Sequence, residues 1–332
     1  DQRHTNFNDV TDAVRDTVVD EYLQEMARLH LSDPQPYIDA GIRVSDSSAA
    51  GNLKELEHEE ARWRALKDYP DPFGELALGW RRRHLPDGGG RAVPCIADTG
   101  QFHHQDGHLT AVLDLEFGHV ADPMHDLTIW RMRDTLIPFG DMAKIYARYE
   151  DLTGWQVDLE ACKRYHFIGC LANLHQFGPA VIHPTLDTDL MTFMQWDSET
   201  NLMATDFLAE YYGIDLPEVE VPKARITRED ASFEYLIGHL GSVKISDEEA
   251  AHSMRLAFRT ARMLFRRHQL GPILDEADID DVHQLIGSRP SETWNDSQWP
   301  MHQPANTMKS SPFCSTRGMP ECTWHLAHRG PL

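Results

Sequence analysis

The sequence predicts an α+β fold that is mostly helical, with one small β element near the middle of the chain. Two observations lead to this prediction. Apolar residues recur at three- and four-residue spacing over most of the chain, which is the period of a helix with one buried face. Near the middle, Asp106-Gly107 separates the short runs 101–104 and 109–115, and Asp-Gly is a strong β-hairpin signal.

The elements follow in order from this reading. A first helix is predicted over residues 10–30, because Val14, Val18, Tyr22 and Met26 recur at helical spacing. The strands are predicted at 92–96, 101–104 and 109–115, the last two forming the hairpin. Prolines end or interrupt helices, so we expect the first helix to end before Pro34 and Pro36. Further helices are predicted at 52–68, 73–84, 126–133, 139–152, 159–177, 187–212, 228–240 and 247–268.

We expect two regions of different character. Residues 1–285 form the folded lobe, and residues 286–332 form a disordered or poorly packed tail with six prolines and ten Ser/Thr but no helical or strand period. The sequence starts at Asp1 without a methionine and runs almost directly into a helical pattern. This start leads us to expect a fragment of a longer protein.

Composition argues against several classes of protein. The net charge is −22 at pH 7, whereas non-specific nucleic-acid binding and docking on anionic lipid need a basic surface. No apolar run approaches the roughly 18 residues that cross a bilayer, and no signal segment opens the sequence. The five cysteines form no CxxC pair, which favours a reduced, cytoplasmic protein. We therefore expect neither nucleic acid nor membrane as a partner.

The predicted hairpin brings oxygen-bearing side chains together. Asp98 precedes its first strand, Gln101 starts that strand, and Asp114 lies near the end of the second. Because antiparallel strands place the start of one beside the end of the next, these three side chains can converge. Two carboxylates and an amide oxygen suit Mg²⁺, which keeps open positions for water and substrate phosphates. The pattern indicates phosphoryl transfer, in which the metal neutralises phosphate charge.

The stretch from Thr110 to Leu127 reads TAVLDLEFGHVADPMHDL. It resembles the motif VTAVLDWEFAHxGDPxxDLA of the aminoglycoside phosphotransferase and choline kinase-like family. Weaker similarity, including Tyr22–His30 (YLQEMARLH), extends over roughly residues 5–270. The resemblance implies the C-terminal lobe of a protein-kinase-like fold. It also implies transfer of the ATP γ-phosphate to the hydroxyl of a small molecule, with Mg²⁺ and ATP as cofactors.

The departures from the family motif are specific. The family has His-Gly-Asp and then Asn five residues after the Asp, whereas this chain has residues 96–102 as IADTGQF, a loop about two residues shorter. We assign it to a divergent subgroup with Asp-x-Gly-Gln-Phe. The resemblance implies that Asp98 is the catalytic base and that Gln101 and Asp114 bind the metal and, through it, the cofactor. Structural support is expected from Asp126, which braces the loop through hydrogen bonds, and from Asp122 and Glu116.

Other readings stay open. Asp114 and Asp98 can simply end a strand and a turn, and Gln101 can lie on an exposed strand edge. The histidines 103, 104 and 108 invite a metal-hydrolase reading, which is less favoured because adjacent strand residues point to opposite faces.

The family's N-terminal lobe, with its Gly-rich loop and lysine, has no counterpart ahead of residue 10. The sequence therefore predicts a truncated phosphotransferase with little ATP turnover of its own. The alternative is a catalytically inactive kinase-like domain that binds a ligand or a partner.

Overall fold

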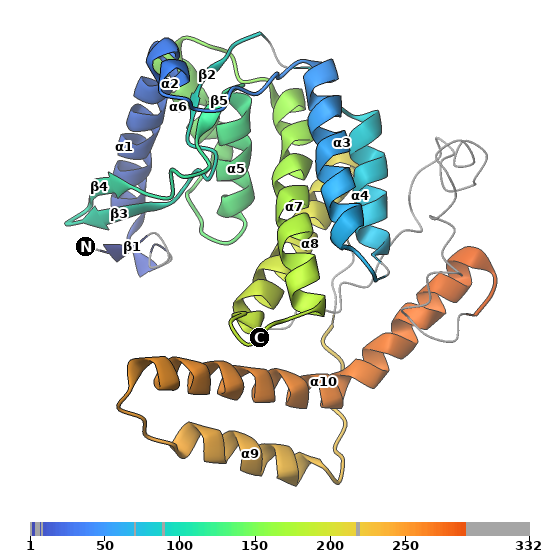
Figure 1. The fold of residues 1–332 in the computed structure, drawn as a ribbon. Coiled ribbons are helices and arrows are strands. Elements are labelled where there is room, and N and C mark those ends of the chain that lie inside the picture. The colour runs from blue at the N-terminus through green and yellow to red at the C-terminus, as the bar shows by residue number, and fades with distance from the viewer. Residues whose placement is uncertain are drawn as a thin grey trace. The chain divides into compact units, whose positions relative to one another are not determined.

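The computed structural model describes residues 2–3, 7, 9–69, 71–87, 90–216 and 220–289 (Figure 1). It is mostly helical with two small antiparallel sheets, so the predicted α+β class is confirmed. The chain divides into two compact units, residues 1–62 with 77–172 and residues 63–76 with 173–332.

The elements are distributed over both units. Two helices, α3 (Ala49–Leu66) and α4 (Pro72–Arg83), cross the boundary between units, as does α7 (Leu159–Ile182). The second unit also holds α8 (Leu190–Tyr212), α9 (Asp230–Ser242) and α10 (Glu248–Ile286). The remaining elements belong to the first unit: β1 (Gln2–Arg3), α1 (Asp12–His30), α2 (Gln35–Asp39), β2 (Val93–Cys95), β3 (Phe102–Gln105), β4 (His108–Val112), β5 (His119–Ala121), α5 (Met124–Asp134) and α6 (Met142–Thr153).

Local sequence signals explain where several helices begin and end. The Asp141 carboxylate accepts the Ala143 N–H at 3.0 Å at the start of α6, and Gly154 closes that helix with a left-handed φ of 72°. The same pair of signals frames α8, with Asp189 at its start and Gly213, φ 65°, at its end. These caps satisfy backbone groups that have no partner within the helix.

The hairpin forms around the predicted turn. Asp106 and Gly107 have φ values of 51° and 82°, as a two-residue turn between twisted strands requires. β3 pairs with β4 on one side and with β1 on the other, while β2 pairs with β5 in a second sheet.

One expectation for this hairpin was wrong, because β4 ends at Val112 rather than at residue 115. Its side chains are half-buried or exposed. As an edge strand of a three-stranded sheet, β4 has no further strand beside it in the described part of the chain, so its apolar run stays partly open.

The core of the first unit lies where α1, α5 and β3 meet. The Tyr22 ring packs edge-on against Trp130, with ring centroids 4.7 Å apart, and Phe102 lies 5.7 Å from Tyr22. Trp80 and Trp130 are 0% exposed, as is Trp63 of the second unit. This packing fixes the elements that flank the predicted site.

Prolines misled the prediction of two helix ends and hid one short helix, although the first helix does end at residue 30 as predicted. Pro34 and Pro36 do not merely follow α1 but start the short helix α2, where proline is tolerated in the first turn. α7 continues past Pro179 to Ile182, and α10 continues past Pro272 to Ile286 instead of ending near residue 268. A proline inside a helix removes one hydrogen bond and often bends the helix, and α10 changes direction along its length (Figure 1).

Most of the predicted tail lies outside the described residues, which end at Arg289. Within the described part of the chain, no helix is both long and apolar enough to cross a membrane.

Candidate functional site

The loop of residues 96–101, which joins β2 to β3, contains the predicted base and the predicted amide ligand. Its backbone is unusual at two points: Ala97 has a φ of 72° and Gly100 has a φ of 93°. Glycine adopts such values freely, whereas alanine does so at a cost. Ala97 stands where the resembling family has glycine, so this chain keeps a left-handed backbone at that position without the residue that favours it.

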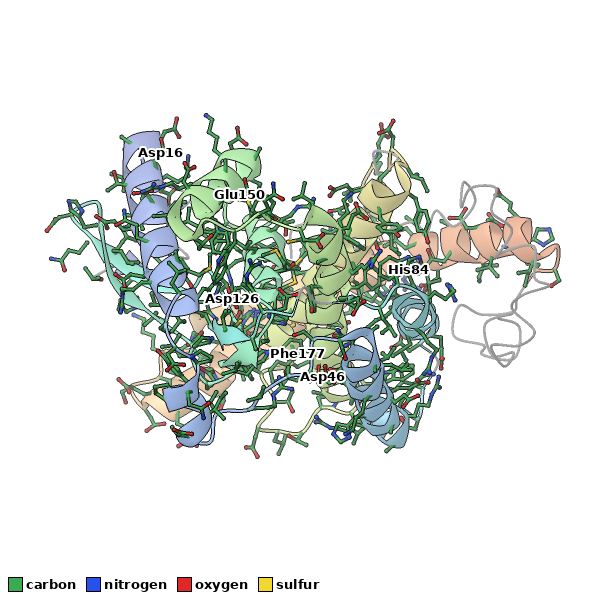
Figure 2. All side chains as sticks on the ribbon, turned by 90° about the horizontal axis from the view of Figure 1, so that it is seen from above. Asp16, Asp46, His84, Asp126, Glu150 and Phe177 are labelled. Carbon is green, nitrogen blue, oxygen red and sulfur yellow. The ribbon has the colours of Figure 1, made fainter. Side chains whose placement is uncertain are left out.

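Asp126 holds the start of this loop. Its two carboxylate oxygens accept the backbone N–H groups of Ile96 at 2.7 Å and Ala97 at 2.8 Å. The side chain is 0% exposed and lies in the interior, whereas Asp16 projects at the surface (Figure 2). Burial alone would raise the pKa of Asp126, but the hydrogen bond and charge of His30 hold that pKa below its usual value. These contacts support the bracing role expected for Asp126.

His30 is a buried partner whose role the sequence prediction did not assign. Its Nε2 lies 3.1 Å from the Asp126 carboxylate and its Nδ1 lies 2.8 Å from the Tyr149 hydroxyl. The side chains of His30 and Asp126 are fully buried, so this chain of hydrogen bonds is shielded from water. The only sequence signal was that His30 ends the Tyr22–His30 stretch that resembles the family.

Asp98 and Gln101 are in direct contact. The Gln101 amide donates to Asp98 Oδ2, and the Arg133 guanidinium forms an ion pair with Asp98 Oδ1. Arg133 comes from the last turn of α5 and also donates from Nε to the Thr99 carbonyl at 3.0 Å. Both oxygens of the predicted base are therefore engaged. Sequence reasoning did not identify Arg133, because nothing in its local pattern shows which loop the end of α5 reaches.

Asp114 lies at the same end of the hairpin but outside the strand. The Leu113 N–H donates to the Gln101 carbonyl at 3.0 Å, which extends the ladder one residue beyond β4. Asp114 follows with a φ of 55° and an exposed side chain. Within the described residues it forms no hydrogen bond with Asp98 or Gln101, so its role as a metal ligand stays a prediction.

The other two predicted support residues differ from each other. Asp122 is 4% exposed, accepts the Met124 N–H at 3.0 Å and receives the Tyr165 hydroxyl at 3.4 Å, so it joins the start of α5 to α7. Glu116 is exposed, and no hydrogen bond or ion pair to it is found in the described part of the chain. The position of Glu116 therefore does not support the expected bracing role.

The described residues contain one group of three potential metal ligands, His30, Cys95 and Asp126, whose ligand atoms lie within 4.8 Å of one another. A hydrogen-bonded core accounts for it better than a metal. Both His30 nitrogens already have partners, and burial, with the Asp126 charge, raises the pKa of the Cys95 thiol well above its usual value. Metal binding would need the thiolate.

The histidines of the hairpin do not converge on one ion. His104 is buried against aromatic rings, with Phe7 at 5.5 Å, and burial lowers its pKa. His103 is half-buried beside it on the pleated strand, and His108 lies at the turn, where it contacts Glu21 at 2.6 Å. The metal-hydrolase reading therefore finds no site here among the described residues.

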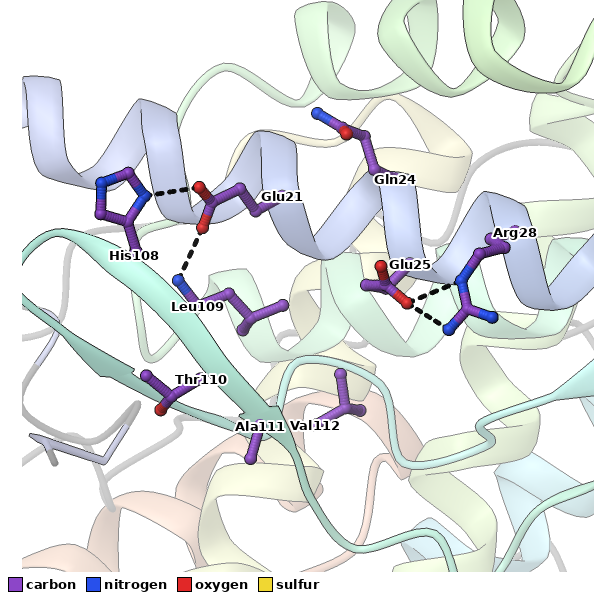
Figure 3. Close-up of a pocket in the computed structure, with 9 residues that line it drawn as sticks. All are labelled: Glu21, Gln24, Glu25, Arg28, His108, Leu109, Thr110, Ala111 and Val112. Carbon is purple, nitrogen blue, oxygen red and sulfur yellow. Dashed lines mark hydrogen bonds and ion pairs between the residues drawn. The ribbon is translucent and has the colours of Figure 1, made fainter.

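A pocket of about 550 Å³ lies between α1 and β4 (Figure 3). Its acidic groups are already engaged: Glu21 accepts from His108 and from the Leu109 N–H, and Glu25 pairs with Arg28. None of Asp98, Gln101 and Asp114 lines this pocket. The predicted chemistry and this pocket are therefore separate places in the molecule.

Taken alone, the loop and the strand end offer carboxylate and amide oxygens beside a fixed guanidinium. Such oxygen donors suit Mg²⁺, and a carboxylate near them can accept a proton from a hydroxyl. Asp98 is 27% exposed and Asp114 is exposed, so both can meet a ligand from solvent.

No protein-family model and no curated protein matches the sequence. Among solved structures, the chain is similar to the crystal structure of a "putative aminoglycoside phosphotransferase" from Ralstonia eutropha, with 17% sequence identity and a TM-score of 0.51. The match covers 62% of this chain and 68% of that chain. At this identity the likeness shows a shared fold alone, which agrees with a kinase-like, helix-rich α+β architecture.

Proposed function

We propose that this chain carries the catalytic part of a phosphotransferase that moves the ATP γ-phosphate to the hydroxyl of a small molecule. The observation that supports it most is the placement of Asp98 and Gln101 at the start of β3, with Asp114 just beyond the end of the paired strand β4. The fold shared with the Ralstonia eutropha protein agrees with this proposal.

In this proposal each group has one task. Gln101 and Asp114 hold Mg²⁺, which is bound by few protein oxygens and completes its shell with water and phosphate. Asp98 accepts the proton of the attacking hydroxyl. Asp126 fixes the start of the loop by accepting hydrogen bonds from the N–H groups of Ile96 and Ala97. We further propose a reducing, cytoplasmic setting, in agreement with the free, buried thiols of Cys95, Cys162 and Cys170.

The test begins with calorimetric titration of Mg²⁺, alone and with ATP, into the full chain. We expect weak Mg²⁺ binding that Asp114→Ala abolishes and that Asp151→Ala, an exposed acidic control on α6, leaves unchanged. A panel of small alcohols and radiolabelled ATP then tests transfer. We expect little transfer from this chain alone, and any that is measured should be lost in Asp98→Ala. Undiminished Mg²⁺ binding by Asp114→Ala would contradict the proposed site.

One observation favours a second function, an inactive kinase-like domain that binds a ligand or a partner. Both oxygens of Asp98 are already occupied, by Arg133 and by Gln101. If that engagement persists with ATP bound, the base is not free to act. This function predicts ATP or Mg²⁺ binding without transfer to any alcohol, and no effect of Asp98→Ala on the binding.

A further inference from the structure

One face of α5 supports the whole candidate loop. Asp126, Trp130 and Arg133 follow one another at i, i+4 and i+7, so they share one side of the helix over two turns, about 10 Å. Asp126 accepts hydrogen bonds from the N–H groups at the start of the loop, and Arg133 donates a hydrogen bond to a carbonyl in the middle of the loop. Trp130 lies between them and packs against Tyr22, whose hydroxyl accepts the Gly100 N–H at 3.0 Å.

Arg133 is held in one place by three different contacts. Its guanidinium pairs with Asp98 Oδ1, its Nε donates to the Thr99 carbonyl at 3.0 Å, and its stem lies against Gly100. The side chain is only 18% exposed. An ion pair with a second, directional hydrogen bond to the same loop is more rigid than an exposed surface pair. Arg133 therefore fixes where the Asp98 carboxylate can point.

The loop is built around this arginine. A Cβ added at Gly100 would lie 2.9 Å from Arg133 Cδ and 3.2 Å from Phe139, so only glycine fits while Arg133 stays in place. Gly100 also has a φ of 93°, which disfavours any other residue. Arg133 of α5 thus holds the shortened loop, which lacks the His-Gly of the resembling family, in one conformation.

We propose that Arg133 is a positioning residue that reserves Asp98 for the substrate hydroxyl by keeping it out of the metal's coordination shell. The inference rests on the proposed phosphotransferase function. A Mg²⁺ ion beside Gln101 and Asp114 would attract any nearby carboxylate, because Mg²⁺ readily takes one or two of them. The guanidinium neutralises the charge of Asp98 and occupies one of its oxygens. Asp98 therefore stays available as the base, while Asp114 binds the metal.

The experiment is calorimetric titration of Mg²⁺ into the full chain and into its variants. We expect Arg133→Gln to bind Mg²⁺ about tenfold more tightly, because Asp98 loses its cation and becomes free to join the metal. Arg133→Lys keeps the charge and should bind Mg²⁺ almost as the unaltered chain does. Arg148→Gln removes another arginine–aspartate ion pair, more exposed and with Asp20 at 2.6 Å, and is the control that should leave the affinity unchanged.

The decisive variant combines Arg133→Gln with Asp98→Asn, which should cancel the gain in Mg²⁺ affinity. If Arg133 had a merely structural role, Arg133→Gln would bind Mg²⁺ more weakly, or its Mg²⁺ affinity would not depend on Asp98. Unchanged or weaker Mg²⁺ binding by Arg133→Gln, or a gain that survives Asp98→Asn, would overturn the inference.

Failure of the proposed metal site, on which the proposed function depends, gives a different result, because the unaltered chain would then bind no Mg²⁺ at all. In that case urea unfolding of the two single variants and the double variant still measures whether Arg133 and Asp98 act as a pair. Strictly additive losses of stability would show that Arg133 does not hold Asp98. A clear coupling energy between Arg133 and Asp98 would support the positioning role of Arg133 and would contradict only the metal site.

Discussion

Left-handed backbone at residues other than glycine marks the ends of the candidate site. Ala97 and Asp114 have φ values of 72° and 55°, and they flank the hairpin at the side where Asp98 and Gln101 lie. Aspartate tolerates this region better than alanine does. The conformation at Ala97 persists because Asp126 binds the N–H groups of Ile96 and Ala97 and so fixes the turn.

Replacing Ala97 by glycine tests this strain. We expect Ala97→Gly to leave the free energy of unfolding within about 0.5 kcal/mol of its original value or to raise it, because relief of the left-handed strain offsets the greater freedom of glycine in the unfolded chain. Ala161→Gly, in the buried part of α7, is the control and should cost about 1 kcal/mol. Urea unfolding measures both. An equal loss in the two variants would mean that Ala97 carries no strain.

Asp126 makes stability depend on pH in acid. Its folded pKa lies below the unfolded value of about 3.9, so the unfolded state binds more protons between the two values. Stability therefore falls as the pH drops below about 4. Asp126→Asn should flatten this fall and should cost about 3 kcal/mol at pH 7, because it disrupts a buried, hydrogen-bonded pair with His30. Urea unfolding from pH 3 to 7 checks both, with the exposed Asp16→Asn as control.

At the scale of elements, the sequence predicted helices wherever apolar residues recurred at helical spacing. The turn at Asp106-Gly107 was also predictable, since two-residue hairpin turns need residues that tolerate positive φ. The exposure of β4 could not be predicted, because a short apolar run reads the same on an edge strand as in a core. The reach of Arg133 to Asp98 depends on how α5 packs against the loop, and that is a tertiary contact with no local pattern.

The partly buried carboxyl of Asp197, on α8 in the second unit, gives an element-level prediction. Burial, with a smaller effect of the Asp71 charge, raises the pKa of Asp197 to about 6. The folded state then binds more protons than the unfolded state between about pH 4 and pH 6, so this carboxyl's contribution to stability is lost as the pH rises through that window.

Removing the titrating group should therefore stabilise the protein at high pH only. We expect Asp197→Asn to raise the free energy of unfolding at pH 8 by on the order of 1 kcal/mol and to change little at pH 4. Urea unfolding at the two pH values is the measurement, and the exposed Asp187→Asn is the control. A loss of stability at pH 8 would show that the Asp197 carboxylate is paired favourably instead.

At the scale of the molecule, helical periodicity and one turn signal predicted the fold class, and one motif led to the proposed chemistry. The structure adds how the candidate loop is supported. The stretch from Thr110 to Leu127, which resembles the family motif, contains Asp114 and Asp126 on either side of β5. Asp114 is exposed, whereas Asp126 is buried and holds the loop. The supporting partners, His30 and Arg133, come from α1 and from the far end of α5. Such long-range partners are set by packing and not by spacing, so the sequence alone could name the loop and its brace Asp126, but neither His30 nor Arg133.

The last prediction concerns where the folded part ends. The sequence placed the boundary at residue 285, but the described structure continues: Gly287, with a φ of 73°, closes α10 by donating its N–H to the His283 carbonyl at 2.9 Å. Arg289 then folds back to pair with Glu276 and Asp280. A chain cut after residue 289 keeps both features, whereas a chain cut after residue 285 loses the cap and the ion pairs.

We therefore expect the 1–289 chain to match the full chain in its thermal melt, and the 1–285 chain to fray at the end of α10. The ion pairs are exposed and contribute little, so most of the effect comes from the lost helix cap and is at most about 1 kcal/mol. Amide hydrogen exchange over residues 276–285 should become up to about fivefold faster in 1–285 and stay unchanged in 1–289. Faster exchange in both would mean that residues beyond 289 stabilise α10, and equal protection in both would mean that the boundary at 285 was right.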